Sequence, residues 1–273
     1  MKENSVIQTV EEVYDITEEG TTKPLRVRLS NNEIAVVKYP NNSCGNQILV
    51  NELISSMVAE IIGLKTPPFG ICHLSEDLIL DLNPDWGLDS DNSGLCFYTK
   101  YISSSIPITF GTLMAMEIKD FDLERLILFD HIICNRERHA GNMILGVGQI
   151  NQLYAIDHGT IFTKGVRYNK ESLLNEVSDE CIFDMSILQT NHKMYDCLQS
   201  RFNCTNAGLL EQCDEILNKL SRDDFKNIES KIPNEWINCV ESDTITELIE
   251  AMSCRVDNLK KITQLIIHER SIN

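Results

Sequence analysis

Two short polar segments of the sequence carry side chains that could perform chemistry. The first, NRERHAGN, occupies residues 135–142, and the second, IDHG, occupies residues 156–159. Together they present Glu137, His139, Asn142 and Asp157. Amide and carboxylate oxygens are the hard ligands that Mg²⁺ prefers, and Mg²⁺ completes its shell with phosphate oxygens and water. These side chains therefore point to phosphoryl transfer, in which a protein mainly positions groups and neutralises charge.

The elements around the two segments are expected to bring them together. After Asp122, a residue type suited to capping a helix, the apolar positions from Leu123 to Ile133 predict a buried helix. Short strands at NMILG (142–146) and QLYAI (152–156) follow and predict a small hairpin. Because both polar segments adjoin this hairpin, we expect them to face one another.

A lysine and a glutamate in the first half of the chain supply two further groups. Lys38 lies near the end of the predicted strand EIAVVKY (33–39), which a turn at 30–32 joins to the predicted strand PLRVRL (24–29). Glu52 lies in a segment whose apolar residues recur at three- and four-residue steps from Leu49 to Ile62, which predicts an amphipathic helix. A strand lysine held by a helix glutamate matches the set of groups found in kinases.

The order of these patterns predicts an α+β fold in two parts. Residues 1–101 contain the predicted strands, including FGICHL (69–74) and LCFYTKYI (95–102), together with one long helix. Residues 102–273 are mostly helical apart from the small hairpin, with apolar stripes at 209–217 and 245–252. We therefore expect a β-rich N-terminal lobe over 1–101 and a helical C-terminal lobe over 102–273.

The charge of the chain argues against several kinds of partner. Its 273 residues include 24 Lys and Arg against 41 Asp and Glu, for a formal net charge of −17. Such a charge repels nucleic-acid backbones and anionic lipid, so we expect neither nucleic acid nor a membrane as a partner. The first residues lack the apolar core of a signal peptide, and no stretch is apolar for the length of a bilayer, which predicts a cytoplasmic protein.

Four segments of the sequence resemble the HipA-like kinases, especially their compact branch, and more distantly the phosphatidylinositol kinases. They are GTTKPLRVRLSNNEIAVVK, VNELISSMVAEIIGLKTPP, FDHIICNRERHAGNMIL and IDHG. The likeness runs from about Gly20 to Phe162 and continues faintly through IPNEW at 232–236. The resemblance implies a two-lobed protein-kinase-like fold, ATP and Mg²⁺ as cofactors, and transfer of the γ-phosphate to a Ser or Thr hydroxyl of a protein.

The resemblance also implies roles for individual residues. Lys38 is expected to contact the α- and β-phosphates, with Glu52 orienting it, while Asn142 and Asp157 hold the metal. The hinge that meets adenine is expected to be formed by Phe97, Tyr98, Thr99, Lys100 and Tyr101.

Residues next to these expected ligands are expected to support the two polar segments. His139 is expected to brace its loop, and Gly159 to permit the turn after Asp157. Asp130, in an otherwise apolar helix, is interpreted as the buried partner of Arg136 or Arg138 rather than as an alternative base.

Two positions depart from the family pattern. Glu137 stands where these families place an aspartate as catalytic base, with the same five-residue step to Asn142. Its carboxylate lies one methylene further out, and a misplacement of about 1 Å can cost about a hundredfold in rate. The segment Gly20-Thr21-Thr22-Lys23, expected to cover the phosphates, has one glycine, and the turn Ser43-Cys44-Gly45 is a second candidate for that cover.

Three functions therefore fit the sequence. In the first, a protein Ser/Thr kinase, Glu137 accepts or orients the hydroxyl proton. In the second, a nucleotide-binding pseudokinase, the protein acts through contacts with other proteins. The third is a small-molecule or lipid kinase, because the loop 137–142 also resembles that class, although the acidic charge disfavours a membrane. A regulatory protein partner is compatible with each of them.

Overall fold

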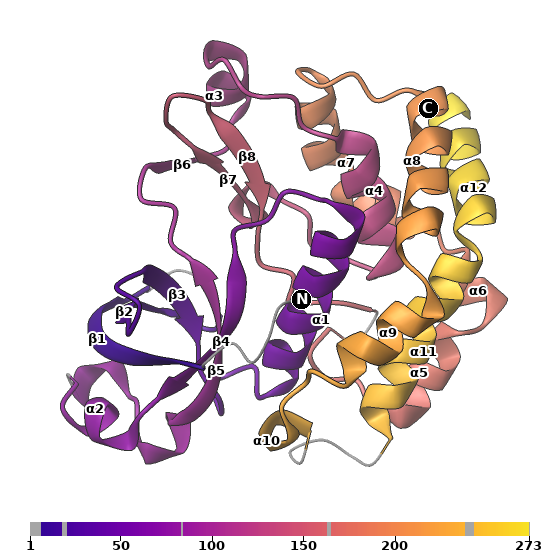
Figure 1. Cartoon of the computed structure of the whole chain (residues 1–273). Helices are drawn as coiled ribbons and strands as arrows, with labels where there is room; N and C mark the ends of the chain where they lie inside the picture. Colours follow the sequence, from indigo (N-terminus) through magenta and orange to yellow (C-terminus); the bar gives the residue numbers. More distant parts are fainter. Residues whose placement is uncertain (1–6, 18–20, 83, 163–164, 238–242, 273) are drawn as a thin grey trace.

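The computed structural model of the protein describes residues 7–17, 21–82, 84–162, 165–237 and 243–272. Figure 1 shows a strand-rich part on one side, a helical part on the other, and a long helix between them. This arrangement confirms the expected α+β fold with a β-rich N-terminal lobe and a mostly helical C-terminal lobe.

Five strands form a closed barrel in the N-terminal lobe. They are β1 (Gln8–Ile16), β2 (Leu25–Leu29), β3 (Ile34–Lys38), β4 (Phe69–Leu74) and β5 (Gly94–Lys100), paired in the order β1-β2-β3-β5-β4. Successive side chains of a strand point to opposite faces. Because Ala35 and Val37 are fully buried inside the barrel, Val36 and Lys38 lie on its outer face.

The helix α1 (Gln47–Ile62) packs between the barrel and the C-terminal lobe. The sequence predicts a helix with one apolar face, but nearly every residue of α1 is buried, because the two lobes cover opposite sides of it. The helix ends at Gly63, whose left-handed backbone (φ 81°) lets its N–H donate to the last carbonyls.

A small sheet and a layer of helices make up the C-terminal lobe. The sheet contains β6 (Ser105–Pro107), β7 (Met143–Gly146) and β8 (Gln152–Ala155), of which β7 and β8 form the predicted hairpin. The helix α4 (Leu123–Ile132) lies beside it, and Asp122 Oδ1 caps this helix by accepting from Arg125 N at 2.9 Å.

The longer of the other helices of this lobe are α7 (Ser186–Gln199), α8 (Asn206–Lys219), α9 (Arg222–Glu229), α11 (Thr244–Asp257) and α12 (Leu259–Ile272). The shorter helices of the chain are α2 (Glu76–Leu80), α3 (Phe110–Ala115), α5 (Lys170–Glu176), α6 (Asp179–Ile182) and α10 (Asn234–Ile237). Four of the longer helices of this lobe, α7, α8, α11 and α12, pack against α4, and α9 and α10 contact α1 (Figure 1). No helix of the described ranges has the length and apolar character needed to cross a membrane.

Most of the segment expected to form the hinge is part of a barrel strand. Phe97, Tyr98, Thr99 and Lys100, expected to form a hinge, belong to β5, and the chain leaves the strand at Tyr101. Pairing with β3 and β4 on both sides keeps this segment in the sheet. The following residues, interpreted from sequence as a connector, contain β6 and lead into α3.

A tryptophan from the C-terminal lobe makes a second link to the same strand. The indole Nε1 of Trp236, in α10, donates to the Leu95 carbonyl near the start of β5 at 2.8 Å. The Trp236 side chain is fully buried, so this hydrogen bond lies away from water.

Candidate functional site

A lysine from the barrel joins two carboxylates, one from each lobe. Lys38 Nζ forms ion pairs with Glu52 of α1 and with Asp157 of the C-terminal lobe, the latter at 2.6 Å to Oδ1. Glu52 Oε2 also accepts from the backbone N–H of His158 at 3.2 Å. The structure therefore brings together three of the residues predicted from sequence.

Charge and burial act against each other within this cluster. Burial acts to lower the pKa of Lys38, but the two carboxylates outweigh it and raise that pKa above its ordinary value. Burial raises the pKa of Glu52 to about 7 against the opposing charge of Lys38. The Asp157 side chain is 53% exposed by area, yet protein surrounds it on most sides. Burial there acts to raise its pKa, and the Lys38 ammonium outweighs this and lowers it to about 2.

The segment 157–159 is held against α1 by its backbone. Asn51 Nδ2 donates to the Gly159 carbonyl at 2.7 Å, and Tyr168 OH donates to Asn51 Oδ1 at 2.7 Å. Asn51 and Tyr168 were not found by sequence reasoning, although an asparagine inside an otherwise apolar helix next to Glu52 was the available signal.

Gly159 is needed for close packing rather than for a turn. The left-handed backbone after β8 belongs to Asp157 (φ 56°), a residue type that tolerates this conformation, so the predicted reason for the glycine is wrong. A Cβ at Gly159 would lie 2.3 Å from Ile48 Cδ1 and 3.1 Å from Glu52 Oε1. The absence of a side chain there lets the segment approach α1 and brings Asp157 to Lys38.

A fully buried ion pair supports the other polar segment. Arg138 donates to both carboxylate oxygens of Asp130, with Nη2 to Oδ1 at 2.8 Å and Nε to Oδ2 at 3.1 Å. Both side chains have no exposed area. The interpretation of Asp130 as the buried partner of an arginine is confirmed, whereas Arg136 pairs instead with Asp184 at 2.7 Å.

Arg138 also fastens the two polar segments to each other. Its Nη1 donates to the Asn142 carbonyl at 3.0 Å, and Ile156 N, next to Asp157, donates to the same carbonyl at 3.0 Å. Its Nη2 lies 3.3 Å from Nδ1 of His158. Burial, with the nearby Arg138 charge, holds the pKa of His158 well below its ordinary value, so this ring is neutral.

Two residues distant in the sequence also hydrogen-bond to Asp130 and Arg138, and sequence reasoning did not find them. Tyr195 OH donates to Asp130 Oδ2 at 2.8 Å, and Asn191 Oδ1 accepts from the backbone N–H of Arg138 at 2.9 Å. Both lie in α7, about one turn apart on the same side of the helix. Neither belongs to a motif predicted from the sequence, and only the folded chain places them beside the loop.

Among the remaining residues of the first polar segment, Asn142 is buried, whereas Glu137 and His139 are exposed. Asn142 Nδ2 donates to the Glu137 carbonyl at 2.7 Å, while no residue that the structure describes donates to its Oδ1. The Glu137 side chain is exposed, and its carboxylate has no hydrogen-bond partner within the described ranges. His139 is exposed as well, and its Nδ1 caps the turn at 140–142 by accepting from Gly141 N at 3.0 Å.

A cavity of about 520 Å³ opens beside Glu137. Thr21 and Ser43, from the two segments predicted to cover the phosphates, line one side of it, and Ser43 Oγ donates to the Thr21 carbonyl. Arg136, Glu137 and Arg167 line it from the C-terminal lobe. Residues of both predicted cover segments therefore lie together at the wall of this cavity. Gly20 itself lies outside the described residues.

The five residues expected to meet adenine do not lie on one face. Phe97 pairs directly opposite Lys38 and Thr99 opposite Val36, so both share the outer face of the barrel. Tyr98 and Lys100 belong to the opposite face, where Tyr98 packs with the barrel interior. Phe97 is buried and packs on Phe69, with ring centroids 6.2 Å apart.

The donor set fits a magnesium nucleotide. Lys38 supplies a cation, Asp157 a half-exposed carboxylate and Asn142 an unused amide oxygen. In the part of the chain that the structure describes, no three His, Cys, Asp or Glu side chains cluster to hold a metal by themselves. A divalent cation carried by a nucleotide can take one or two protein oxygens and obtain its other ligands from phosphates and water.

Comparisons with known proteins identify the family and the fold. A family model described as HipA-like kinase matches residues 10–264. In structure, the chain is similar to the proinflammatory kinase CtkA of Helicobacter pylori, with a TM-score of 0.59, 12% identity, and 96% and 97% of the two chains covered. These values show a common fold.

Two further solved structures resemble the chain. The Golgi casein kinase with Mn and ADP bound has a TM-score of 0.53 and 13% identity, with 95% of this chain and 73% of that chain covered. HipA of Shewanella oneidensis, in complex with HipB and operator DNA, has a TM-score of 0.46 and 8% identity, with 96% and 68% covered. No protein of curated function matches the sequence.

Proposed function

Because the chain belongs to the HipA-like kinase family, we propose that it transfers the γ-phosphate of ATP to a Ser or Thr hydroxyl of a protein. Lys38 binds the α- and β-phosphates, and Glu52 holds the lysine in place. Asn142 and Asp157 hold Mg²⁺, which supplies positive charge against the phosphate oxygens when it is bound. We place the boundary between the nucleotide-covering lobe and the catalytic lobe at residue 101.

The observation that carries the proposal is the ion pair between Lys38 and Asp157. It joins the outer face of the barrel to the loop after β8 at 2.6 Å, so the predicted phosphate ligand lies in contact with one of the two predicted metal ligands. The cluster Lys38, Glu52 and Asp157 holds one positive and two negative groups. When both carboxylates are ionised, the cluster has an excess negative charge that a divalent cation neutralises.

In the proposed reaction, Glu137 accepts the proton of the attacking hydroxyl. Its carboxylate is exposed at the wall of the cavity of about 520 Å³. The Glu137 N–H donates to Asn135 Oδ1 and its carbonyl accepts from Asn142 Nδ2, which holds the main chain in place. As the hydroxyl oxygen bonds to the γ-phosphorus, the bond to the bridging oxygen breaks and ADP leaves. The hydroxyl proton passes to Glu137, which acts as the general base.

The experiment compares the protein with an Asp157→Asn variant. Each is incubated with radiolabelled ATP, Mg²⁺ and a lysate whose own kinases have been inactivated by heat. We expect labelled protein with the parent chain and a loss of about 100-fold or more with Asp157→Asn, because the metal loses its charged ligand. The control is Asp214→Asn, an exposed aspartate of α8 that pairs with Lys260 and lies outside the site. Equal labelling by the parent and Asp157→Asn would overturn the mechanism.

A second candidate function is a nucleotide-binding pseudokinase, favoured by the glutamate at the base position. It predicts that Mg²⁺ and ATP raise the melting temperature while no label is transferred. The variant Glu137→Asp separates the two candidates, since it moves the carboxylate back by one methylene. An increase in transfer identifies an impaired enzyme, whereas stabilisation by ATP without transfer in both forms identifies the pseudokinase.

A further inference from the structure

An arginine lies on the same face of the barrel as Lys38. In β2, Leu25 and Val27 are fully buried inside the barrel, so Arg26 between them points outward. Register places Arg26 opposite Val36 of β3, which in turn lies opposite Thr99 of β5. Val36 is two residues, or about 7 Å, from Lys38 along the strand.

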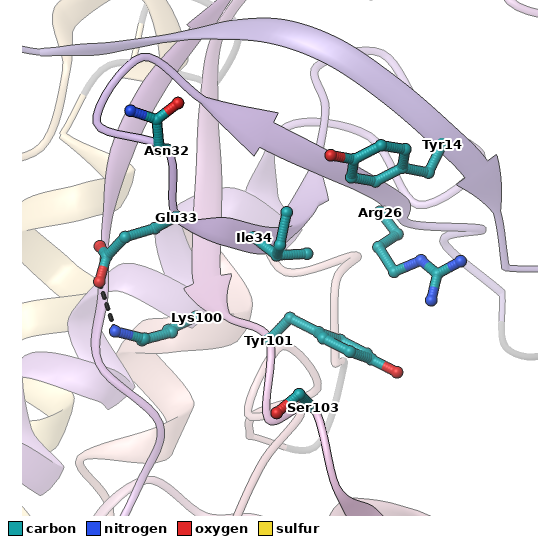
Figure 2. A pocket seen from close by; sticks show the side chains of 8 residues that line it. All are labelled: Tyr14, Arg26, Asn32, Glu33, Ile34, Lys100, Tyr101 and Ser103. Atoms are coloured by element: carbon teal, nitrogen blue, oxygen red, sulfur yellow. Dashed lines mark hydrogen bonds and ion pairs between the residues drawn. The ribbon is translucent and has the colours of Figure 1, made fainter.

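The Arg26 side chain forms a wall of a separate cavity of about 590 Å³ (Figure 2). Its guanidinium carbon lies 5.5 Å from the ring centroid of Tyr101 and 6.0 Å from that of Tyr14. Tyr101 is the first residue of the connection between the lobes, and Ser103 lines the cavity two residues further on. The Lys100 and Glu33 ion pair lies at another side of the cavity.

Arg26 has hydrogen-bonding capacity that the protein does not use. Its Nη2 pairs with Asp15, but its Nε is buried and has no acceptor among the residues that the structure describes. A surface arginine serving only as the partner of Asp15 needs neither two aromatic neighbours nor a cavity. The planar, delocalised guanidinium is suited to lie flat against an aromatic ring.

We infer that Arg26 recognises the nucleobase of the bound nucleotide. The inference rests on the proposed function and adds a residue that recognises the base. A nucleotide whose phosphates lie on Lys38 extends along the same face of the barrel, past Val36 and toward Arg26 and Tyr101. The base then stacks under the Arg26 guanidinium, which attracts the π-face of the base as a cation does that of an aromatic side chain.

The experiment separates the contribution of the base from that of the phosphates. Binding of Mg²⁺ with ATP, and of Mg²⁺ with tripolyphosphate, which has no base, is measured by calorimetry on the full chain. The variants are Arg26→Met, Arg26→Lys and Lys38→Met. The matched control is Arg28→Met, because Arg28 lies on the same strand and face but pairs with Glu11 and Glu12 outside the cavity.

We expect Arg26→Met to weaken ATP binding about tenfold and to leave tripolyphosphate binding unchanged. Arg26→Lys, which keeps the charge but loses the planar group, should fall between the parent and Arg26→Met. Lys38→Met should weaken the binding of both ligands, and Arg28→Met should change the binding of neither.

Three results would overturn the inference alone. In the first, Arg26→Met weakens the binding of ATP and of tripolyphosphate equally. In the second, Arg26→Met leaves the binding of ATP unchanged. In the third, the parent chain binds ATP no more tightly than tripolyphosphate. A parent chain that binds neither ligand would instead overturn the proposed function, and this inference with it.

Discussion

Two clusters of charged residues lie close together in this protein and differ in their access to water. The pair Asp130 and Arg138 is fully buried, balanced in charge, and surrounded by donors from Asn135 and Tyr195. The cluster Lys38, Glu52 and Asp157 has an excess negative charge and a carboxylate that is 53% exposed. The same kind of interaction therefore shapes a loop in one place and offers groups to a ligand in the other.

The largest expected effect comes from making the same substitution in each cluster. Asp130→Asn leaves Arg138 buried beside a neutral partner and should lower the free energy of unfolding by about 3–5 kcal/mol. Asp157→Asn removes a half-exposed carboxylate while Lys38 keeps its pair with Glu52, so the loss should stay within about 1 kcal/mol. Urea denaturation of both variants measures the difference, and similar losses would contradict the distinction between the clusters.

The next prediction concerns the protonation of a histidine in the buried region. His131 follows Asp130 in α4 and is fully buried, and neither ring nitrogen has a hydrogen-bond partner within the described chain. Burial, with a contribution from Arg255, lowers the pKa of His131 to about 3 from an ordinary 6.5. Between pH 6.5 and about 3, His131 binds a proton in the unfolded chain but not in the folded chain. The free energy of unfolding therefore decreases as the pH falls through this range.

The variant His131→Leu isolates this contribution from that of the many carboxylates. At pH 5 it should be about 2 kcal/mol more stable relative to the parent than it is at pH 8, because only the parent loses stability through this histidine. Denaturation curves at the two pH values give this difference. A difference that does not change with pH would show that His131 titrates normally in the folded protein.

The smallest effect concerns how closely the exposed cluster is assembled. Gly159→Ala places a methyl group against Ile48 and Glu52, and should lower the free energy of unfolding by about 1–2 kcal/mol. Gly148→Ala is the matched control, since its nearest atom lies at 3.9 Å, an ordinary contact. Thermal or urea denaturation checks the pair, and an unaffected Gly159→Ala would mean that α1 shifts freely to admit the methyl group.

The sequence predicts those parts of the site that depend on local patterns. Lys38 follows alternating strand residues and Glu52 lies on a periodic helix, so their types and positions were predictable, as was the burial of Asp130 in an apolar helix. The short β6 and α3 were missed because a few residues carry too little periodicity.

Residues that act across long separations could not be predicted in this way. Tyr195 of α7 donates to Asp130, and Tyr168, which precedes α5, donates to Asn51. The sequence around each tyrosine distinguishes buried from exposed positions but does not indicate these distant partners. The space required at Gly159 is likewise a property of two packed segments, because it arises from Ile48 on α1. Arg26 resembles any outward residue of a strand until the register places it in one row with Val36 and Thr99.

The hydrogen bond from Trp236 restricts how the two lobes can move. It holds the start of β5 to the C-terminal lobe, while Tyr101 continues into that lobe from the other end of the strand. A strand anchored at both ends does not serve as a free pivot, and swinging the lobes apart would break this hydrogen bond and expose the buried indole ring to water. We therefore expect nucleotide exchange to proceed through displacement of the loops around Thr21 and Ser43, with the lobes keeping a fixed relative orientation.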